Sequence, residues 1–527
     1  MSESANERIG ESADERISKC PITHNPKSTT LNLAVGILLL TLCVRVAWLL
    51  RFPTNPIAPV DAEGFHLLAV NILAGHSFAI GWEPPFCPTA VRTPLYPLLV
   101  ASIYALGGAA PGRVLPFHLL LEALTTALVI RLGHDLGGKR VGLWAGLLYA
   151  CNGTTQRYTG YLLAEALLLP LLTASVWLTL RCLRRPTHTK AALTGLLWGL
   201  TLLIKPNVQF LALFVGGLLT WRMANGELAN QRISESANGL QPQSRITHHE
   251  SRLTFLAFWL ILAVVLFPWL LRNRAVLGKW MLSTAFPENL ARVSAVATLA
   301  EHEGVRVEPW TETWEYYYDR LVADVRERDE WDAPTPHRDV CVEQRQRQTE
   351  VARAAWNIVR DHPVSYLRAH VRGVLTSLRD PGHRLWYHIL TGKEWETTGV
   401  VADIGARMLW SLERGAVGDA LRALWLERIA RPPLLAALLW WGLSAARVAV
   451  WVLGLRGAWR LRRRPWALLA LLGTVAYVLL LPGPIAYDRF YLPAIPVVVV
   501  LVLTGFLKPV RTGETIARGC PGCWNAV

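Results

Sequence analysis

Long apolar runs alternate with short polar connections along most of this chain. The first run, residues 31–50, has about 20 residues, the length that crosses the hydrocarbon core of a bilayer as a helix. No small-residue cleavage site follows it, so we interpret it as a retained anchor. Runs of similar character recur at residues 113–131, 141–151, 161–180, 191–204, 207–221, 253–271, 433–453, 466–482 and 492–508. The pattern predicts an all-α, polytopic membrane protein with about ten or more transmembrane helices.

Composition and charge support a membrane protein. Of 527 residues, 52% are hydrophobic and only 18% are charged, which is too apolar for an ordinary soluble enzyme. The net charge is +15, but the cations gather in short connections such as residues 181–190 and 456–466. This pattern orients a membrane protein and does not indicate nucleic-acid binding. A cytoplasmic N-terminus places these basic connections on the cytoplasmic side.

The same topology places two long segments outside the membrane. Residues 51–112 form the first outer loop, and the short apolar run at 94–107 within it is expected to be an interfacial or re-entrant helix. Residues 272–432 are the only soluble-looking region of domain size. The amphipathic stretch at 351–381 predicts helices that lie on the membrane surface, with a break at Pro363.

The chain is therefore predicted to have five consecutive regions. They are a disordered cytoplasmic N-terminus at 1–30, a transmembrane core at 31–271, a mostly helical extracytoplasmic insertion at 272–432, C-terminal transmembrane helices at 433–508 and a cytoplasmic tail at 509–527. The tail contains Cys520 and Cys523, a lone CxxC pair that we interpret as inert thiols.

Ionisable residues from separate parts of the chain share one predicted depth, at the outer membrane face. Such a set places carboxylates and fixed cations beside lipid. It suits a lipid-linked phosphate, because guanidinium groups hold phosphate oxygens bidentately and partial desolvation strengthens the attraction. The candidates are Asp61, Glu63, Arg92, Glu165, Lys205, Arg272 and Arg489.

Several of these residues also have an interpretation that involves no ligand. Lys205 and Arg272 end apolar helices, where a basic side chain often reaches the interface, and Arg45 in the first run is expected to do the same. Glu165 lies inside the start of a span, where an acid needs a partner or a polar cavity, so helix packing stays open. Asp61 has the strongest case for function, with a solvated loop acid as its alternative.

Signals for metal binding and redox chemistry are weaker. His66 and His76 have no paired His or Glu spacing, so we interpret them as structural and predict no metal site. Cys87 and Cys341 are both placed outside, where an oxidising compartment would allow them to form a disulfide.

Several motifs follow one another in order along the chain. They are an acid after the first span, RTPLYP from Arg92, LLAEALLL around Glu165, GLLWGLTLLIKPN around Lys205, PWLLRN around Arg272 and DRFYLPAIP around Arg489. Through these motifs the chain resembles the bacterial members of the protein mannosyltransferase-like (family 39) glycosyltransferases, which belong to the GT-C superfamily together with the aminoarabinose transferases. The resemblance covers roughly residues 31–290 and 433–508.

This resemblance implies an inverting transfer at the extracytoplasmic face of a bacterial inner membrane. The donor would be a sugar on a polyprenyl phosphate, and the acceptor a protein hydroxyl, a lipid or a glycan. Asp61 matches the acid that would deprotonate the acceptor, and Arg92 matches the residue that would hold the lipid phosphate. The other matched substrate-binding positions are Tyr96, Glu165, Lys205, Arg272 and Arg489.

One departure from the family concerns the acids of the first outer loop. The eukaryotic members have adjacent Asp and Glu, whereas Ala62 separates Asp61 from Glu63 here. Neighbours at this spacing point apart on a helix, so either carboxylate could be the base. An inverting displacement also predicts that Asp61 lies across a cavity from Arg92 and not beside it. A divalent cation could assist, although no ligand spacing demands one.

Two other classes of membrane protein remain as alternatives. A secondary transporter also has polar residues among many spans, but the sequence has no matching halves with paired broken helices. A non-catalytic scaffold or lipid flippase would tolerate the loss of Asp61. The sequence therefore favours a membrane glycosyltransferase over both.

Overall fold

The computed structural model describes residues 26–236, 248–305, 307, 311–329, 331, 339–379, 386–387, 390–391, 404–426, 434–485 and 488–507. Within these ranges the chain is helical, and its β structure is limited to an isolated bridge between Ala79 and Pro88. The predicted all-α fold class is confirmed. The tail at 509–527 and most of the predicted disordered segment lie outside the described residues, but the first described helix already begins at Pro26.

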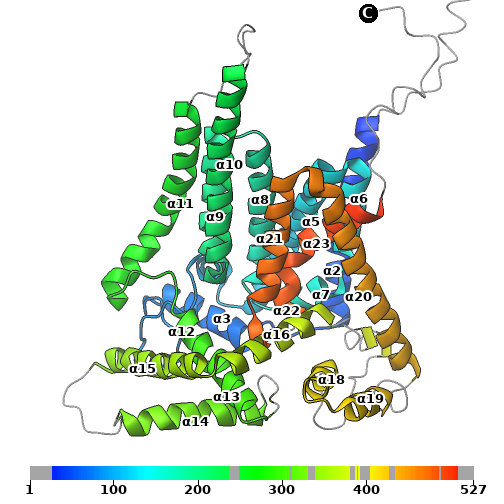
Figure 1. The fold of residues 1–527 in the computed structure, drawn as a ribbon. Helices are drawn as coiled ribbons and strands as arrows, with labels where there is room; N and C mark the ends of the chain where they lie inside the picture. The colour runs from blue at the N-terminus through cyan, green and yellow to red at the C-terminus, as the bar shows by residue number, and fades with distance from the viewer. Residues whose placement is uncertain are drawn as a thin grey trace, which may run out of the picture.

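The apolar runs form an upright bundle of helices (Figure 1). The bundle helices are α2 (Pro26–Arg51), α5 (Leu115–Gly137), α6 (Lys139–Ala150), α8 (Glu165–Arg184), α9 (His188–Leu202), α10 (Gln209–Ser236), α11 (His248–Leu277), α20 (Leu434–Arg460), α21 (Pro465–Leu480) and α23 (Ile495–Phe506).

Among the described residues, six helices are long and apolar enough to cross a membrane. They cover Thr29–Arg51, Pro111–Gly137, Glu165–Arg184, Thr254–Leu277, Ala437–Arg463 and Arg489–Phe506. The other predicted runs are also helical, but α6 and α9 have only 12 and 15 residues, or roughly 18–23 Å. Because the hydrocarbon core is thicker than that, the count of about ten spans stays a prediction.

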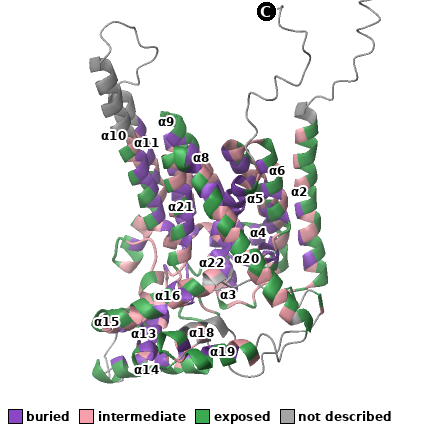
Figure 2. Ribbon diagram, turned by 45° about the vertical axis from the view of Figure 1, so that its right-hand side comes forward, coloured by how far each residue is buried: buried purple, intermediate pink, exposed green. Residues whose placement is uncertain are grey.

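The bundle helices differ in how far their side chains are buried (Figure 2). Helix α2 has many exposed apolar side chains, whereas α23 is almost wholly buried, as expected for a lipid-facing and a central helix. Helices α20 and α23 pack closely because each has a glycine at the contact. A β-carbon at Gly457 would overlap the backbone carbonyl of Leu501, and one at Gly505 would overlap that of Leu453.

The remaining helices are shorter, and most of them lie across one end of the bundle, at the bottom of Figure 1. They are α3 (Val60–Leu73), α4 (Leu95–Gly107), α7 (Gly153–Thr159), α12 (Ala285–Asn289), the π-helical turn Leu290–Ala295, α13 (Val296–His302), α14 (Glu312–Arg328), α15 (Val340–Asp361), α16 (Pro363–Arg379), α18 (Ile404–Glu413), α19 (Val417–Trp425) and α22 (Asp488–Tyr491). Short 3₁₀ turns lie between helices of the chain, at Pro111–Val114, Pro206–Val208, Leu461–Arg463, Gly483–Ile485 and Leu492–Ala494.

Helix α16 joins these outer helices to the bundle. It begins at Pro363, two residues after α15 ends, so the predicted helix break is confirmed. Its Gly373 lies so close to the backbone carbonyl of Gly483 that a β-carbon would overlap it. The His370 Nε2 also lies 2.8 Å from the carbonyl oxygen of Leu480. Helix α16 thereby holds the segment that leads to Arg489. Its contact with a membrane surface stays a prediction.

Candidate active site

Five of the predicted site residues meet at one end of the bundle, the end that the sequence analysis places outside and that we therefore call the outer end. Each lies where a helix begins or ends, because the apolar run that precedes or follows it fills the membrane-spanning part. Asp61 is in the first turn of α3, where a carboxylate is favoured by the helix dipole, and Glu165 is the first residue of α8. Arg92 precedes α4, Lys205 follows α9, and Arg489 lies in α22.

We call Asp61, Arg92, Glu165, Lys205 and Arg489 the outer charge network. Arg489 is its centre, because its Nη1 lies 2.7 Å from Asp61 Oδ2 and its Nε lies 2.7 Å from Glu165 Oε1. Lys205 Nζ donates to the same Glu165 oxygen at 2.8 Å. Arg92 donates to the remaining oxygen of Asp61 and also lies over the ring of Phe65. Three cations therefore surround two carboxylates.

The network is open on one side. The side chains of Asp61 and Arg92 keep exposed fractions of 34% and 27%, whereas those of Arg489 and Glu165 keep 10% and 3%. Burial alone would raise the pKa of Asp61, but Arg92 and Arg489 outweigh it and hold that pKa below its ordinary value. Asp61 therefore stays ionised at neutral pH on the accessible side of the network.

The predicted relation between Asp61 and Arg92 is wrong for this structure. We expected the two residues on opposite sides of a cavity, but they form a direct ion pair. The physical reason is that Arg92 and Asp61 lie on the same loop. The Asp61 carboxylate is therefore within reach of Arg92 and compensates its guanidinium charge.

Arg272 does not join the outer charge network. Its Nη1 donates to the carbonyl oxygen of Thr89 at 2.8 Å and to Asn273 Oδ1 at 2.9 Å, and its guanidinium lies over Trp269. The backbone at 89–91 is held further by the residues that follow α11, since Ser283 Oγ donates to Val91 and the Thr284 N–H donates to Ala90. Arg272 thus fixes the backbone that leads into Arg92.

The sequence also pointed to Glu63 and Tyr96, whose contacts are with residues outside the outer charge network. Glu63 Oε1 accepts a hydrogen bond of 3.0 Å from the indole of Trp82, which is itself 63% exposed. Tyr96 is fully buried, and its hydroxyl lies 3.0 Å from His118 Nε2. Tyr96 is therefore enclosed by the protein in this structure, and its role in substrate binding stays a prediction. Sequence reasoning missed Trp82 and His118, and neither lies in a motif that would have identified it.

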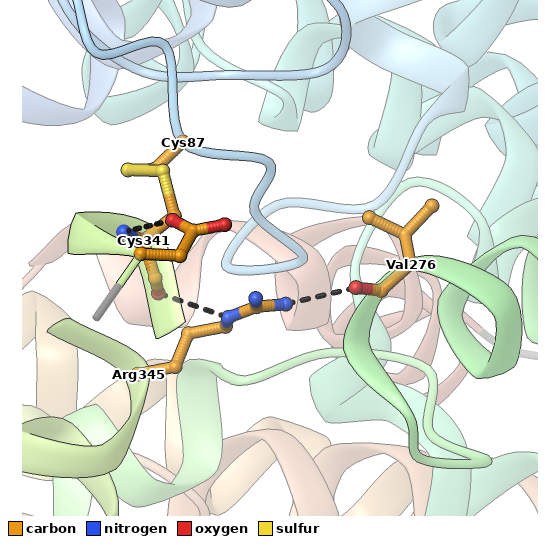
Figure 3. The surroundings of a disulfide bond; sticks show 5 residues. Cys87, Val276, Cys341 and Arg345 are labelled. Atoms are coloured by element: carbon orange, nitrogen blue, oxygen red, sulfur yellow. Dashed lines mark hydrogen bonds between the residues drawn. A yellow bond between two sulfur atoms is a disulfide. The ribbon is translucent and has the colours of Figure 1, made fainter. Parts of the chain in front are cut away.

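The loop that carries Asp61 and Arg92 is tied to the outer helices. Cys87 in this loop and Cys341 in α15 form a disulfide, with a Cα–Cα distance of 5.2 Å (Figure 3). In α15, Arg345 donates to the carbonyl oxygen of Cys341 at 3.0 Å and to that of Val276 at 2.8 Å. The pairing that the sequence allowed is thus present. It requires the first outer loop and the outer helices to lie on one side of the membrane.

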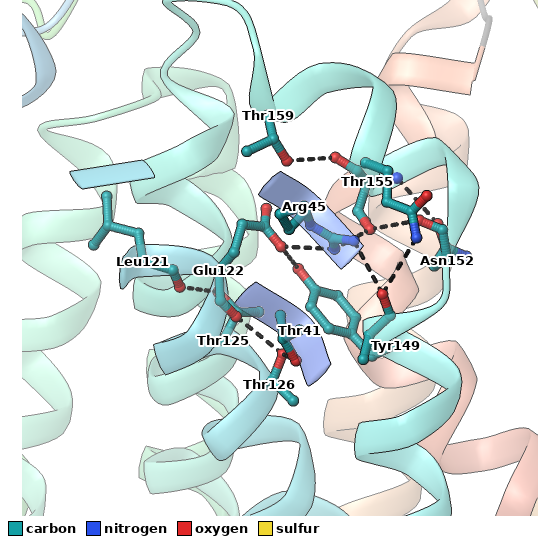
Figure 4. Close-up of polar contacts among 12 residues, drawn as sticks. Thr41, Arg45, Leu121, Glu122, Thr125, Thr126, Tyr149, Asn152, Thr155 and Thr159 are labelled. Atoms are coloured by element: carbon teal, nitrogen blue, oxygen red, sulfur yellow. Dashed lines mark hydrogen bonds and ion pairs between the residues drawn. The ribbon is translucent and has the colours of Figure 1, made fainter. Parts of the chain in front are cut away.

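A second ion pair lies within the spans, between α2 and α5. Arg45 is fully buried, so the expectation that it reaches the interface is wrong. Its Nη2 lies 3.0 Å from Glu122 Oε2, and that oxygen also accepts from the hydroxyl of Tyr149 at 3.1 Å (Figure 4). Arg45 further donates to the Thr155 hydroxyl and to the carbonyl oxygen of Ala150. A lone Glu in one apolar run and a lone Arg in another were the signal for this pair.

The contacts of the carboxylates bear on the divalent cation that the sequence analysis left open. Within the described ranges, no group of three or more His, Cys, Asp or Glu side chains is placed to hold a metal ion. Asp61 and Glu165 are surrounded by guanidinium and ammonium groups, which repel a cation. These residues therefore do not fit a divalent cation in this arrangement.

A family model matches the segment that contains much of the network. Residues 91–232 match the model described as dolichyl-phosphate-mannose-protein mannosyltransferase. The matched segment includes Arg92, Glu165 and Lys205. The resemblance to protein mannosyltransferase-like GT-C glycosyltransferases is therefore confirmed over this segment. No curated protein matches the chain.

Solved structures with a similar path of the chain come from the archaeon Archaeoglobus fulgidus. Its oligosaccharyltransferase in the apo form is 12% identical with a TM-score of 0.45, and the match covers 91% of this chain and 51% of that one. The oligosaccharyltransferase AglB from the same organism, in complex with an inhibitory peptide and a dolichol-phosphate, is 13% identical with a TM-score of 0.41, over 92% of this chain and 50% of that one. The present chain spans about half the length of these proteins.

Proposed function

We propose that this protein is an integral membrane glycosyltransferase that moves a sugar from a polyprenyl-phosphate donor to an acceptor hydroxyl at the extracytoplasmic face of a bacterial inner membrane. The observation that carries the proposal is the outer charge network, in which three cations and a half-exposed carboxylate meet at the end of a membrane bundle. The family match over residues 91–232 supports the same class of reaction.

The cations of the network suit the phosphate of the donor. Arg92, Lys205 and Arg489 come from three separate elements and outnumber the two carboxylates that they contact. As the bond between the sugar and the phosphate breaks, negative charge develops on the leaving phosphate. Positioned cations in a partly desolvated site stabilise that charge and remove the need for an acid that protonates the leaving oxygen.

Asp61 is the proposed base. It takes the proton of the acceptor hydroxyl while the acceptor oxygen forms a bond to the anomeric carbon. The bond from that carbon to the phosphate oxygen breaks in the same step, and polyprenyl phosphate leaves with the electron pair. A phosphate that binds Arg92 and Arg489 competes with Asp61 for both guanidiniums, so donor binding releases the carboxylate for its task.

Glu165 acts as a positioning residue in this proposal. It is buried and accepts hydrogen bonds from Lys205 and Arg489, so it sets where both cations point. Arg272 has a similar indirect role through the backbone before Arg92. The membrane lipid surrounds the polyprenyl chain, and a protein hydroxyl, a lipid or a glycan is the acceptor.

The test compares two carboxylates that are two residues apart. Membranes with the wild-type protein should release polyprenyl phosphate from a radiolabelled polyprenyl-phosphate sugar when acceptor is present. Asp61→Asn should reduce the release by about 10²–10⁴-fold, the usual contribution of a general base. Glu63→Gln is the matched control and should stay within severalfold of wild type, because Glu63 contacts Trp82 and none of the cations. Full activity of Asp61→Asn would remove Asp61 as the base, and no release by wild type would favour a transporter or flippase.

A further inference from the structure

A second group of cations lies at the other end of the bundle. The cavity between the end of α8 and the start of α9 has a volume of about 550 Å³ and is lined by Arg181, Arg184, Arg185 and Lys190. We call it the basic cavity. Its size lies within the range of small-molecule binding sites in proteins.

The length of helix α8 gives the distance between the basic cavity and the outer charge network. Glu165 is the first residue of this helix and Arg184 is the last of its 20 residues, which correspond to about 30 Å along the axis. This length equals the thickness of the hydrocarbon core of a bilayer. The basic cavity therefore lies at the opposite membrane surface and cannot be part of the outer site.

The charge around the basic cavity is poorly compensated. Among the described side chains, Asp135 is the carboxylate that contacts these cations, through Arg181 Nε at 3.1 Å. The same carboxylate also accepts from the indole of Trp177 at 3.0 Å. Arg184 donates instead to the backbone carbonyl of Asp135, and Lys190 to that of Arg185. Among the described side chains, four cations thus line the basic cavity and one acid contacts them.

The surroundings of the basic cavity also contain apolar surface. Leu193 is 46% exposed and follows Lys190 by three residues on α9, so both side chains lie on one face of that helix. A ligand with an anionic head and an apolar chain would match this arrangement. Basic residues at the ends of spans commonly orient a membrane protein. Four of them around one cavity also form a site that can bind an anionic lipid head group.

We propose that the basic cavity binds the phosphate of an anionic phospholipid in the leaflet opposite the outer charge network. The guanidinium groups of Arg181, Arg184 and Arg185 hold the phosphate oxygens, and the ammonium of Lys190 adds a further charge-assisted hydrogen bond. The acyl chains extend along the apolar face that contains Leu193. Lipids without net charge provide no net negative charge to compensate the four cations of the basic cavity.

The experiment measures the thermal unfolding of the purified full chain in neutral detergent. Phosphatidylglycerol should raise the unfolding temperature, and phosphatidylcholine should leave it nearly unchanged, because only binding to the folded state stabilises. In the double variant Arg185→Gln/Lys190→Gln, the phosphatidylglycerol concentration at half effect should rise roughly tenfold, since two charged contacts are lost. The charge-preserving variant Arg185→Lys/Lys190→Arg should recover most of the effect.

The matched control removes two cations that do not line the cavity. Arg462→Gln/Arg463→Gln changes the net charge at the same end of the bundle by the same amount and should keep the response to phosphatidylglycerol. Equal loss in this control would overturn the proposal, as would a wild-type protein that responds equally to both lipids. A third titration uses inorganic phosphate. Protection by inorganic phosphate without protection by phosphatidylglycerol would replace the lipid with a soluble anion and overturn the assignment.

Discussion

The two ion-pair networks of this protein use the same chemistry but differ in balance and access. Arg45 and Glu122 are both fully buried, one cation meets one carboxylate, and hydroxyl and carbonyl groups complete the contacts. In the outer charge network, cations outnumber carboxylates, and Asp61 and Arg92 keep about a third of their side chains exposed. A balanced, closed pair fixes helices against one another. An open pair with surplus positive charge can exchange one carboxylate for another anion.

The largest expected effect is on stability, at the closed pair. Glu122→Gln leaves the Arg45 charge buried without a counter-charge, which typically costs about 3–5 kcal/mol of folding free energy. Thermal unfolding in detergent should therefore show a large fall in unfolding temperature. The double variant Arg45→Leu/Glu122→Leu is the control and should recover most of this loss, because no lone charge remains. A stable single variant would contradict the assignment of a closed, structural pair.

A Glu-to-Gln substitution in the outer charge network should reduce catalysis more than stability. Glu165→Gln weakens the contacts that aim Lys205 and Arg489, so kcat should fall roughly 10–100-fold, as expected when charged groups are displaced by about an ångström. The KM for the donor should not rise, because the variant carries one more net positive charge. Steady-state kinetics on purified protein separate the two quantities. A rise in KM at constant kcat would contradict a positioning role.

A smaller effect on activity is expected when the disulfide between the first outer loop and α15 is removed. In Cys87→Ser/Cys341→Ser, the loop that carries Arg92 keeps its hydrogen bonds to the residues after α11, so activity should fall only severalfold. The disulfide itself is checked by mass spectrometry with an alkylating agent. Reduction before alkylation should add two labels to wild type that the double variant lacks. An unchanged label count after reduction would show that the pair does not form.

The smallest expected effect is on the pH dependence of stability. Because the pKa of Asp61 is lower in the folded protein than in the unfolded chain, the unfolded chain binds the proton first as pH falls. The contribution of Asp61 to stability is therefore complete above about pH 4 and is lost as pH falls through the folded pKa. Unfolding temperatures between neutral pH and about pH 3 should fall more steeply in wild type than in Asp61→Asn. Parallel curves would contradict the paired state of Asp61.

The sequence predicted which residues share the outer end of the bundle, but not how they pair. Asp61, Arg92, Glu165, Lys205 and Arg489 all flank apolar runs, so the pattern along the chain was enough to assign them one depth. Their partners depend on how the helices are arranged side by side, and hydropathy contains no information on that arrangement.

The same limit explains why the contacts of individual residues were not predicted. The pairing of Arg45 with Glu122, the burial of Tyr96 and the contact of Arg272 with a backbone carbonyl all depend on neighbours from other helices. The fold class was easier to predict from the sequence. A long apolar run that crosses a membrane must satisfy its backbone hydrogen bonds internally, as a helix does. The predicted region boundaries and the roles of the site residues stay predictions.

The disulfide also sets the order in which the site can be completed during biosynthesis. Cys87 and Cys341 are separated by 254 residues, so a ribosome that adds about 5–20 residues per second needs roughly 13–50 s to supply the second thiol after the first. On the proposed topology, the loop with the proposed base would be translocated before its disulfide to α15 can form. The disulfide would then form in an oxidising compartment only after the outer helices have emerged.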